Sequence, residues 1–336
     1  MRMNKKINKT NLIFLITTII ILKIIYTRIA KLNVQTAWQY IEIDDGLAPI
    51  ENHRYFTTRD MRHIYFHHTS DLDAYQMCVV ESAARTHYDW QINVIFSGLV
   101  NSIERLKKHF LRFGNVKFWR MRIDKYLHNT SLEHLVDERI LQTSQYLFTQ
   151  TREVVRYVTL YKWDGVYLDL NMLIVKSLND LPMNFATRKI YPSVSDGILR
   201  FSNDKVGRHV ADAAMRDVAN TFNTTVNLNN GTGTMTRVLT ERCKLFDNTL
   251  GSVYSCNGFY VFAPNYFCTI TWRLGAKFSL PSYILNNFSY GYHLGDDTNF
   301  RELSLATKTA IYNILARLYC PYTYQIFKED FLYPYY

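Results

Sequence analysis

The sequence predicts an α/β domain carried on a single N-terminal membrane-anchor helix. Three observations support this: strand-like and helix-like segments alternate between residues 61 and 175, an apolar run lies near the N-terminus, and the composition is globular, with 48% hydrophobic and 20% charged residues. The 336 residues are enough for one large or two ordinary domains. The chain has no repeat period or low-complexity tract, which excludes solenoids and flexible linkers.

The anchor is predicted from an apolar run and its flanking charges. Residues 11–22 are almost wholly apolar, and residues 24–26 extend the run beyond Lys23. At 1.5 Å per residue the run covers about 25 Å, enough for a thin bilayer if Lys23 snorkels to its edge. Basic residues precede the run, which predicts a cytosolic N-terminus. A cleaved signal peptide and a buried helix are the alternatives, although residues 26–31 offer no small-residue cleavage site.

The positive charge of the chain is concentrated around this run. The formal net charge is +10, and residues 1–31 hold seven basic and no acidic residues. Removing these seven charges leaves a net charge of about +3. We therefore expect no nucleic-acid partner, because no later segment carries a long basic block. The predicted organisation is a cytosolic tail (1–10), an anchor (11–27), a stem (28–58) and a lumenal domain (59–336).

The elements of the lumenal domain follow from periodicity. Strands are expected at 61–66, 92–96, 116–121, 166–170 and 172–175, and helices at 73–87, 102–113 and 153–161. The C-terminal half is less regular and has helical candidates at 206–222, 234–243 and 304–319. In such an α/β domain the ligand site is expected beyond the carboxyl ends of the strands.

A lumenal location permits disulfides and N-glycans. Five cysteines are present, so at least one is free or paired between chains, and spacing does not assign the pairs. None has the C-x-x-C spacing of a zinc site. Glycan acceptor sequences begin at Asn129, Asn223, Asn230 and Asn287.

The segment from Arg152 to Asn171 contains candidate catalytic and metal-binding residues. It is predicted to be a helix, a glycine turn and a strand, with Glu153 and Arg156 on one helix face and Asp169 and Asn171 on one side of an extended stretch. Carboxylate and amide oxygens suit Mg²⁺ or Mn²⁺, which would neutralise a diphosphate leaving group. A plainer interpretation remains open, in which the helix pair is an exposed ion pair and the strand simply ends in polar residues.

This segment resembles the S-D-x-x-R-Y-x-x-L-Y-x-x-G-G-x-Y-x-D-x-D signature of DxD sugar transferases. The whole chain resembles the lactosylceramide 4-α-galactosyltransferase and α-1,4-N-acetylglucosaminyltransferase family in particular, from about residue 62 to residue 324. The further segments that carry this resemblance are Cys78–Arg85, Ser195–Phe201, Asn229–Val238, Ser282–Tyr283, Tyr292–Leu294 and Cys320–Tyr324.

The resemblance implies a GT-A type, Rossmann-like domain on a type II, single-pass Golgi membrane anchor. It implies that Asp169 and Asn171 hold Mn²⁺ and the UDP diphosphate, and that Glu153 and Arg156 bind the donor sugar, so that Asp169, Arg156 and Glu153 are the catalytic candidates. The implied donor is UDP-galactose or UDP-N-acetylhexosamine, and the implied acceptor a glycosphingolipid or glycan. Other donor or acceptor contacts are expected at Tyr157, Gly165, Asp196, Gly197, Asn230, Gly231 and His293. For His293 a purely structural role is an equal alternative.

The departures from the family pattern lower the expected activity. Asn171 replaces an aspartate and weakens the cation site, and Glu153 replaces an aspartate and lengthens the reach of the carboxylate. Asp164 stands where a glycine is expected at the turn. His68 replaces a glutamate, and no cysteine follows it, so Cys78 is expected to lack its usual partner. Two functions follow: a UDP-sugar-dependent hexosyltransferase that forms α1,4 linkages, or a catalytically inactive Golgi protein that binds glycans or nucleotides.

Overall fold

The computed structural model describes residues 16–26, 45–52, 62–188, 193–226, 233–243, 253–269, 289–294 and 305–332. The chain forms two compact units, Met1–Ile43 and Asp44–Tyr336. In the first unit, residues 16–26 are helical with exposed side chains, and the rest of the predicted anchor lies outside the described residues. Among the described residues no helix is both long and apolar enough to cross a membrane.

The second unit alternates strands and helices much as the sequence predicts. Its strands are β1 (Ala48–Pro49), β2 (His63–His68), β3 (Gln91–Phe96), β4 (Val116–Arg120), β5 (Gly165–Leu168), β6 (Met172–Ile174), β7 (Phe185–Arg188), β8 (Val194–Phe201), β9 (Tyr254–Cys256), β10 (Phe259–Phe262), β11 (Phe267–Thr269) and β12 (Gly291–His293). Its α-helices are α3 (Ala74–Thr86), α4 (Ile103–Phe110), α5 (Ile123–Leu127), α6 (His134–Asp137), α7 (Leu147–Trp163), α8 (Lys205–Thr221), α9 (Thr234–Cys243), α13 (Leu305–Tyr319), α14 (Pro321–Ile326) and α15 (Lys328–Leu332). Short 3₁₀ turns occupy Ile50–Asn52, Leu141–Thr143 and Pro264–Tyr266.

The strands form two sheets within the described residues. The larger has the order β1-β4-β3-β2-β5-β8-β7-β10-β9, and the smaller has the order β11-β12-β6. Strands β1, β4, β3, β2 and β5 are parallel, whereas β8 runs antiparallel to both β5 and β7. The carboxyl ends of β3, β2 and β5 therefore meet at one edge of the larger sheet.

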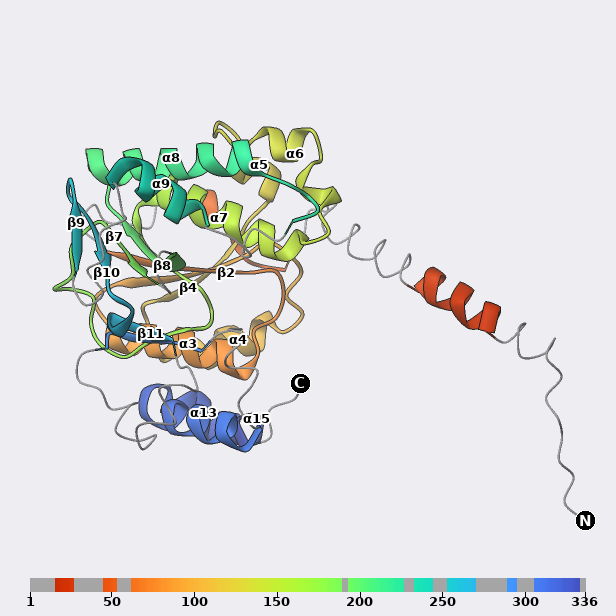
Figure 1. Cartoon of the computed structure of the whole chain (residues 1–336). Helices are drawn as coiled ribbons and strands as arrows, with labels where there is room; N and C mark the ends of the chain where they lie inside the picture. The colour runs from red at the N-terminus through yellow and green to blue at the C-terminus, as the bar shows by residue number, and fades with distance from the viewer. Residues whose placement is uncertain are drawn as a thin grey trace, which may run out of the picture. The chain divides into compact units, whose positions relative to one another are not determined.

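Helices cover both faces of the larger sheet (Figure 1). Helices α7, α8 and α9 lie over one face, and α3 and α4 lie over the other, with α13 and α15 packed outside them. Strands β2 and β3 are buried along almost their whole length, because both faces of the sheet are covered. This layered α/β arrangement agrees with the predicted Rossmann-like fold.

Part of the predicted stem belongs to the folded domain. Strand β1 pairs in parallel with β4, and the Asp45 carboxylate accepts hydrogen bonds from Arg120 in an ion pair that is less than 9% exposed on either side. The segment escapes a periodicity search because a two-residue strand shows no alternation.

The start of α3 is fixed by a capping box. The Asp73 side chain accepts a hydrogen bond from the Gln76 backbone N–H at 2.8 Å, and the Gln76 side chain accepts one from the Asp73 backbone N–H at 3.0 Å. Two of the orphan donors at this helix end are thereby satisfied.

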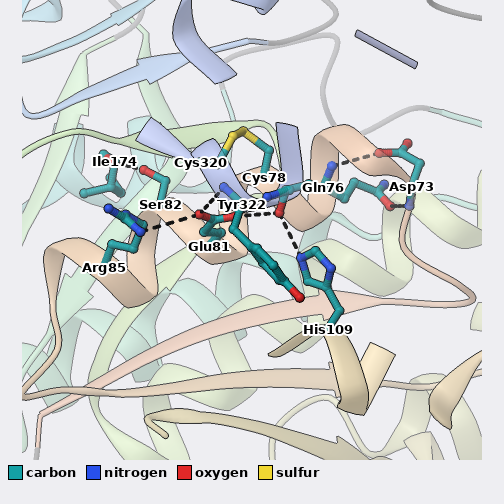
Figure 2. Close-up of a disulfide and its surroundings, with 11 residues drawn as sticks. Asp73, Gln76, Cys78, Glu81, Ser82, Arg85, His109, Ile174, Cys320 and Tyr322 are labelled. Carbon is teal, nitrogen blue, oxygen red and sulfur yellow. Dashed lines mark hydrogen bonds and ion pairs between the residues drawn. A yellow bond between two sulfur atoms is a disulfide. The ribbon is translucent and has the colours of Figure 1, made fainter. Parts of the chain in front are cut away.

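The C-terminal helices are fastened to α3 by a disulfide and a buried carboxylate (Figure 2). Cys78 is bonded to Cys320, so it is paired even though no cysteine follows His68 to serve as its usual partner. One turn along α3, the fully buried Glu81 accepts hydrogen bonds from the backbone N–H groups of Tyr322 and Thr323, at 3.1 and 2.7 Å. A second disulfide joins Cys243 to Cys256 across a sequence separation of 13 residues.

The turn between α7 and β5 is strained where the sequence analysis expected a glycine. Asp164 adopts φ 54° and ψ −175°, a region that costs a non-glycine residue about 1–3 kcal/mol. We expect Asp164→Gly to raise the free energy of unfolding by about 1 kcal/mol, measured by urea denaturation. Asp164→Ala, which removes the half-buried carboxylate but keeps a Cβ, is the control and should gain less. Equal gains in both variants would assign the effect to the carboxylate instead of the backbone.

Candidate active site

The candidate site lies at the edge where the parallel strands end. Strand β5 ends at Leu168 and is followed at once by Asp169, and the N-terminal half of α7 lies beside this edge because α7 leads into the opposite end of β5. Strand β8 runs antiparallel to β5 and brings Asp196 and Gly197 to the same place, where the Asp169 backbone N–H donates to the Gly197 carbonyl at 3.0 Å.

Arg156 is the centre of the site. Its guanidinium is 1% exposed and contacts three carboxylates: Asp169 at 2.6 Å, Glu153 at 2.8 Å and Asp196 at 2.9 Å. The predicted helix pair of Glu153 and Arg156 is therefore real, but it is buried, which removes the interpretation of an exposed ion pair. Buried carboxylates of this kind need a cation, and Arg156 supplies it.

Glu153 and Asp196, two of the acid groups around Arg156, share a proton. Burial, and then the neighbouring Asp196 carboxylate, raise the pKa of Glu153 from 4.5 to about 8 despite the opposing charge of Arg156. Burial would raise the pKa of Asp196 as well, but Arg156 and a hydrogen bond with Glu153 hold that pKa below its usual value. At neutral pH the Glu153 carboxyl is thus protonated and donates to an ionised Asp196.

Asp169 and Asn171 lie in a turn, not in the extended stretch that the sequence predicts. The Asp169 carbonyl accepts a hydrogen bond from the Met172 backbone N–H at 2.9 Å, which closes the turn between β5 and β6. Strand β12 pairs with β6 and sets His293 opposite Met172, while the Leu294 backbone N–H donates to the Asn171 carbonyl at 2.7 Å. His293 therefore lies beside this turn.

Gly197 is required by its close contact with the His293 ring. A Cβ at Gly197 would lie 3.1 Å from that ring. His293 and Gly197 thus lie close to each other and to the turn that holds Asp169 and Asn171.

Several polar atoms of the site are buried without a hydrogen-bond partner among the described residues. They include Asn171 Oδ1, Arg156 Nε and the Tyr167 hydroxyl, whose ring faces Arg156 at 5.3 Å. Buried polar atoms in folded proteins are almost always paired, so unpaired ones gathered at one place indicate a ligand position. Asn171 Oδ1 in particular is a neutral oxygen ligand suited to a hard divalent cation.

Other predicted site residues are placed differently. Gly165 lies at the opposite end of β5 from Asp169, where its φ of 101° and the His63 carbonyl 2.7 Å from a hypothetical Cβ explain the glycine. Its role is therefore in the turn. Tyr157 is completely buried within α7, next to the carboxylates of the site but without exposed surface for a ligand. Asn230 and Gly231 lie outside the described residues.

Arg152 and His67 complete the site and were not assigned a role from the sequence. Arg152 Nε lies 4.0 Å from Asp169 Oδ1, one helical turn before Arg156. His67, near the end of β2, is hydrogen-bonded to the Ser97 hydroxyl at 2.9 Å, and burial together with His68 and the two arginines lowers its pKa to about 3, so it stays neutral. The i, i+4 spacing of Arg152 and Arg156 was the available signal for Arg152.

A mixed α/β sheet with acids and arginines gathered beyond the ends of its parallel strands defines a Rossmann-like domain with a ligand site at that edge. Residues 73–187 match the family described as glycosyltransferase sugar-binding region containing DXD motif, and residues 203–327 match the alpha 1,4-glycosyltransferase conserved region. The chain is a divergent member of this family of glycosyltransferases, and the motif itself reads Asp169-Leu170-Asn171.

Two curated relatives illustrate the divergence. Lactosylceramide 4-alpha-galactosyltransferase of Pan troglodytes is 27% identical over 281 residues, which cover 79% of this chain and 77% of that protein. Alpha-1,4-N-acetylglucosaminyltransferase of Homo sapiens is 24% identical over 263 residues, which cover 74% of each chain.

Two solved structures align with much of the chain at low identity. The glycosyltransferase GlyE of Streptococcus pneumoniae aligns with a TM-score of 0.46 at 13% identity, covering 82% of this chain and 65% of that chain. The galactosyltransferase LgtC aligns with a TM-score of 0.44 at 15% identity, covering 77% of this chain and 95% of that chain. Because both scores lie below 0.5, the fold assignment depends on the sheet topology and the family matches.

The shared proton predicts a pH dependence of stability. Between pH 4.5 and about 8 the folded protein keeps a proton on Glu153 that the unfolded chain has lost, so this contribution to stability is present at low pH and is lost as the pH rises through that window. We expect the free energy of unfolding of Glu153→Gln to fall less steeply as the pH rises. At pH 9 it should exceed that of the natural protein by at least about 1 kcal/mol. Denaturation at a series of pH values measures this. The exposed Glu104→Gln is the control, and parallel curves for all three proteins would contradict the shared proton.

Proposed function

We propose that the protein is a retaining glycosyltransferase that moves galactose or an N-acetylhexosamine from its UDP form, in α1,4 linkage, to a glycolipid or glycan acceptor. The observation that carries the proposal is the arginine-centred acid cluster near Asn171, whose side-chain oxygen has no hydrogen-bond partner within the part of the chain that the structure describes. Two curated relatives are named lactosylceramide 4-alpha-galactosyltransferase and alpha-1,4-N-acetylglucosaminyltransferase, and these names support galactose and N-acetylhexosamine as the donor sugars.

The residues present fit a weak divalent-cation site. Asp169 offers a carboxylate, Asn171 an amide oxygen without a partner among the described residues, and His293 lies beside the same turn. The described part of the chain holds no group of three or more His, Cys, Asp and Glu side chains suited to a metal, so diphosphate oxygens would have to complete the coordination. When bound, Mn²⁺ would supply the charge that neutralises the departing diphosphate.

The chain's own residues would then orient the donor sugar. Arg152 and Arg156 face the carboxylates of Asp169 and Asp196, so the opposite charges of these side chains offset one another before the donor binds. Arg156 holds the three acid groups in fixed positions, and Asp196, with a third of its side chain exposed, can accept from a sugar hydroxyl. Such fixed dipoles act on the transition state without reorganising. The acceptor hydroxyl would approach the anomeric carbon on the face from which UDP leaves.

A membrane location is part of the proposal. We propose a type II protein of the Golgi membrane, anchored by residues 11–27, with residues 59–336 in the lumen near its glycolipid acceptors. The apolar residues of the 16–26 helix and the basic residues before it support this. An N-terminal tag should be digested by protease added to sealed vesicles, whereas a C-terminal tag should be protected. The reverse pattern would overturn the orientation.

Donor turnover and donor binding test the enzyme directly. The protein is incubated with Mn²⁺ and a panel of UDP-sugars, and hydrolysis and transfer to lactose-terminated glycolipid are measured. Asp169→Asn should lower Mn²⁺-dependent UDP affinity at least about tenfold, because it removes the charged oxygen ligand. Asn171→Asp should raise Mn²⁺ affinity.

The outcomes separate the two functions. Transfer with any donor supports the enzyme. Binding of UDP without turnover, in both the natural protein and Asn171→Asp, would favour the inactive binding protein. Metal-dependent affinity that survives in Asp169→Asn would place the site elsewhere.

A further inference from the structure

A cavity lies between α3, α4 and the C-terminal helices. Its volume is about 320 Å³, and its lining includes Asp73 and Met77 of the α3 region, Arg105 of α4, and Phe327 and Asp330 from the C-terminal segment. None of these residues belongs to the cluster around Arg156. The cavity is at the lower end of the size range of small-molecule sites.

The lining combines an apolar floor with charged groups. Met77 is buried at the floor, as are Leu72 and Leu106. The Phe327 ring forms an aromatic wall, with the Arg105 guanidinium carbon 4.9 Å from the ring centre. Tyr75 donates to the Asp330 main-chain carbonyl at 2.8 Å, which fixes the position of α15 relative to α3.

The carboxylates of Asp73 and Asp330 differ in the hydrogen bonds that they make within the fold. One oxygen of Asp73 accepts the capping hydrogen bond from Gln76, as Figure 2 shows. Asp330 is partly exposed, and its contact with Tyr75 is made by the main chain. The Asp330 carboxylate is thus the acceptor at this cavity that the capping box does not engage.

The charged and apolar groups that line the cavity disfavour alkyl chains and anions as ligands. An alkyl chain would cover Arg105, Asp73 and Asp330 without pairing them, which costs free energy. A phosphate or another anion would meet two carboxylates. A neutral sugar ring offers hydroxyls that donate to carboxylates in charge-assisted hydrogen bonds, and C–H faces that pack on an aromatic ring and a methionine.

We propose that this cavity binds a neutral hexose unit of a glycan. The binding itself does not depend on the proposed function. The role of the bound hexose does depend on the proposed function. Strand β2 ends at His68 and the chain then reaches Asp73, so the cavity lies at the sheet edge that also carries the candidate active site. If the chain is a transferase, the cavity would hold a sugar of the acceptor away from the reacting end.

Two methionines allow the cavity and the active site to be observed separately. Met77 lines the cavity, and Met172 is buried directly beside Asn171. The full chain is labelled with ¹³C-methyl methionine, kept in a detergent without a sugar headgroup, and titrated with lactose, with n-hexanol, and with UDP plus Mn²⁺. The Met77 signal is assigned with Met77→Leu, and the Met172 signal with Met172→Leu.

Lactose is expected to shift the Met77 methyl signal to saturation. Asp330→Asn should raise the lactose concentration at half-saturation at least about tenfold, because the charged acceptor is lost. Glu329→Gln, one residue away on α15 and outside the lining, should leave it unchanged. Melting curves confirm that both variants are folded.

Contrary outcomes identify what has failed. No Met77 shift with lactose, an equal shift in Asp330→Asn, or saturation by n-hexanol at a lower concentration than by lactose would each overturn the hexose site. A missing Met172 response to UDP and Mn²⁺ would instead count against the proposed transferase, whatever Met77 does.

Discussion

Arg156→Gln is expected to lower the free energy of unfolding by about 3–5 kcal/mol, because it removes the buried cation that contacts the acid groups of Asp169, Glu153 and Asp196. The same variant should lose detectable UDP binding, since Asp169 and Asp196 would no longer be held in place. Urea denaturation at pH 7 and titration with UDP measure the two effects. Lowering the pH should restore part of the lost stability, because protonation removes the unpaired charges.

Two further variants test the cause of this effect. Arg156→Lys keeps the charge but cannot contact three carboxylates with a rigid fork, so an intermediate loss is expected. Arg216→Gln removes an arginine from an exposed ion pair with Asp212 on α8 and should cost no more than about 1 kcal/mol. If Arg156→Gln costs no more than Arg216→Gln, the cluster is not the buried ionic centre described above.

Loss of the disulfide between Cys78 and Cys320 is expected to have an effect of similar size. The bond closes a loop with a sequence separation of 242 residues, so replacing both cysteines by serine should cost about 4–5 kcal/mol. Thermal and denaturant unfolding of the double variant measure the loss. The C-terminal helices should separate from α3 first, which hydrogen exchange of residues 312–326 would reveal.

The other disulfide is the matched control. Cys243 and Cys256 are separated by 13 residues, and the corresponding double serine variant should lose about 3 kcal/mol at most. A larger loss from this pair would show that native-state contacts, and not loop length, dominate the effect.

Several helices of the fold are readable from the sequence, whereas the eight-residue β8 was not predicted and α7 extends beyond its predicted range of 153–161 at both ends. The helices at 74–86, 205–221 and 234–243 lie within a residue or two of their predicted ranges, because each presents an apolar stripe over several turns. Strands of two to four residues, such as β1 and β7, span too few positions for a period to be counted. Their assignment depends on pairing partners far along the chain.

The candidate site could be predicted only in part, because only some of its residues lie close together in the sequence. Glu153, Arg156 and Asp169 belong to one continuous motif, and their convergence follows from a helix, a turn and a strand. The depth of burial, which turns an ion pair into a proton-sharing cluster with Asp196, depends on the packing of α7 against the sheet. The pairing of Cys78 likewise depends on where α14 is packed, which no local pattern contains.

The attachment of α14 to α3 has a consequence for how the chain is made. The Glu81 carboxylate is fully buried and pairs with Arg85 of the same helix, but its hydrogen-bond partners, Tyr322 and Thr323, lie 241 and 242 residues further along the chain. Until those residues emerge from the ribosome, α3 exposes a charged group and an unpaired thiol on the surface that the last helices will cover. The packing around α3 is therefore completed only after the 241 residues that separate Glu81 from Tyr322 have been made.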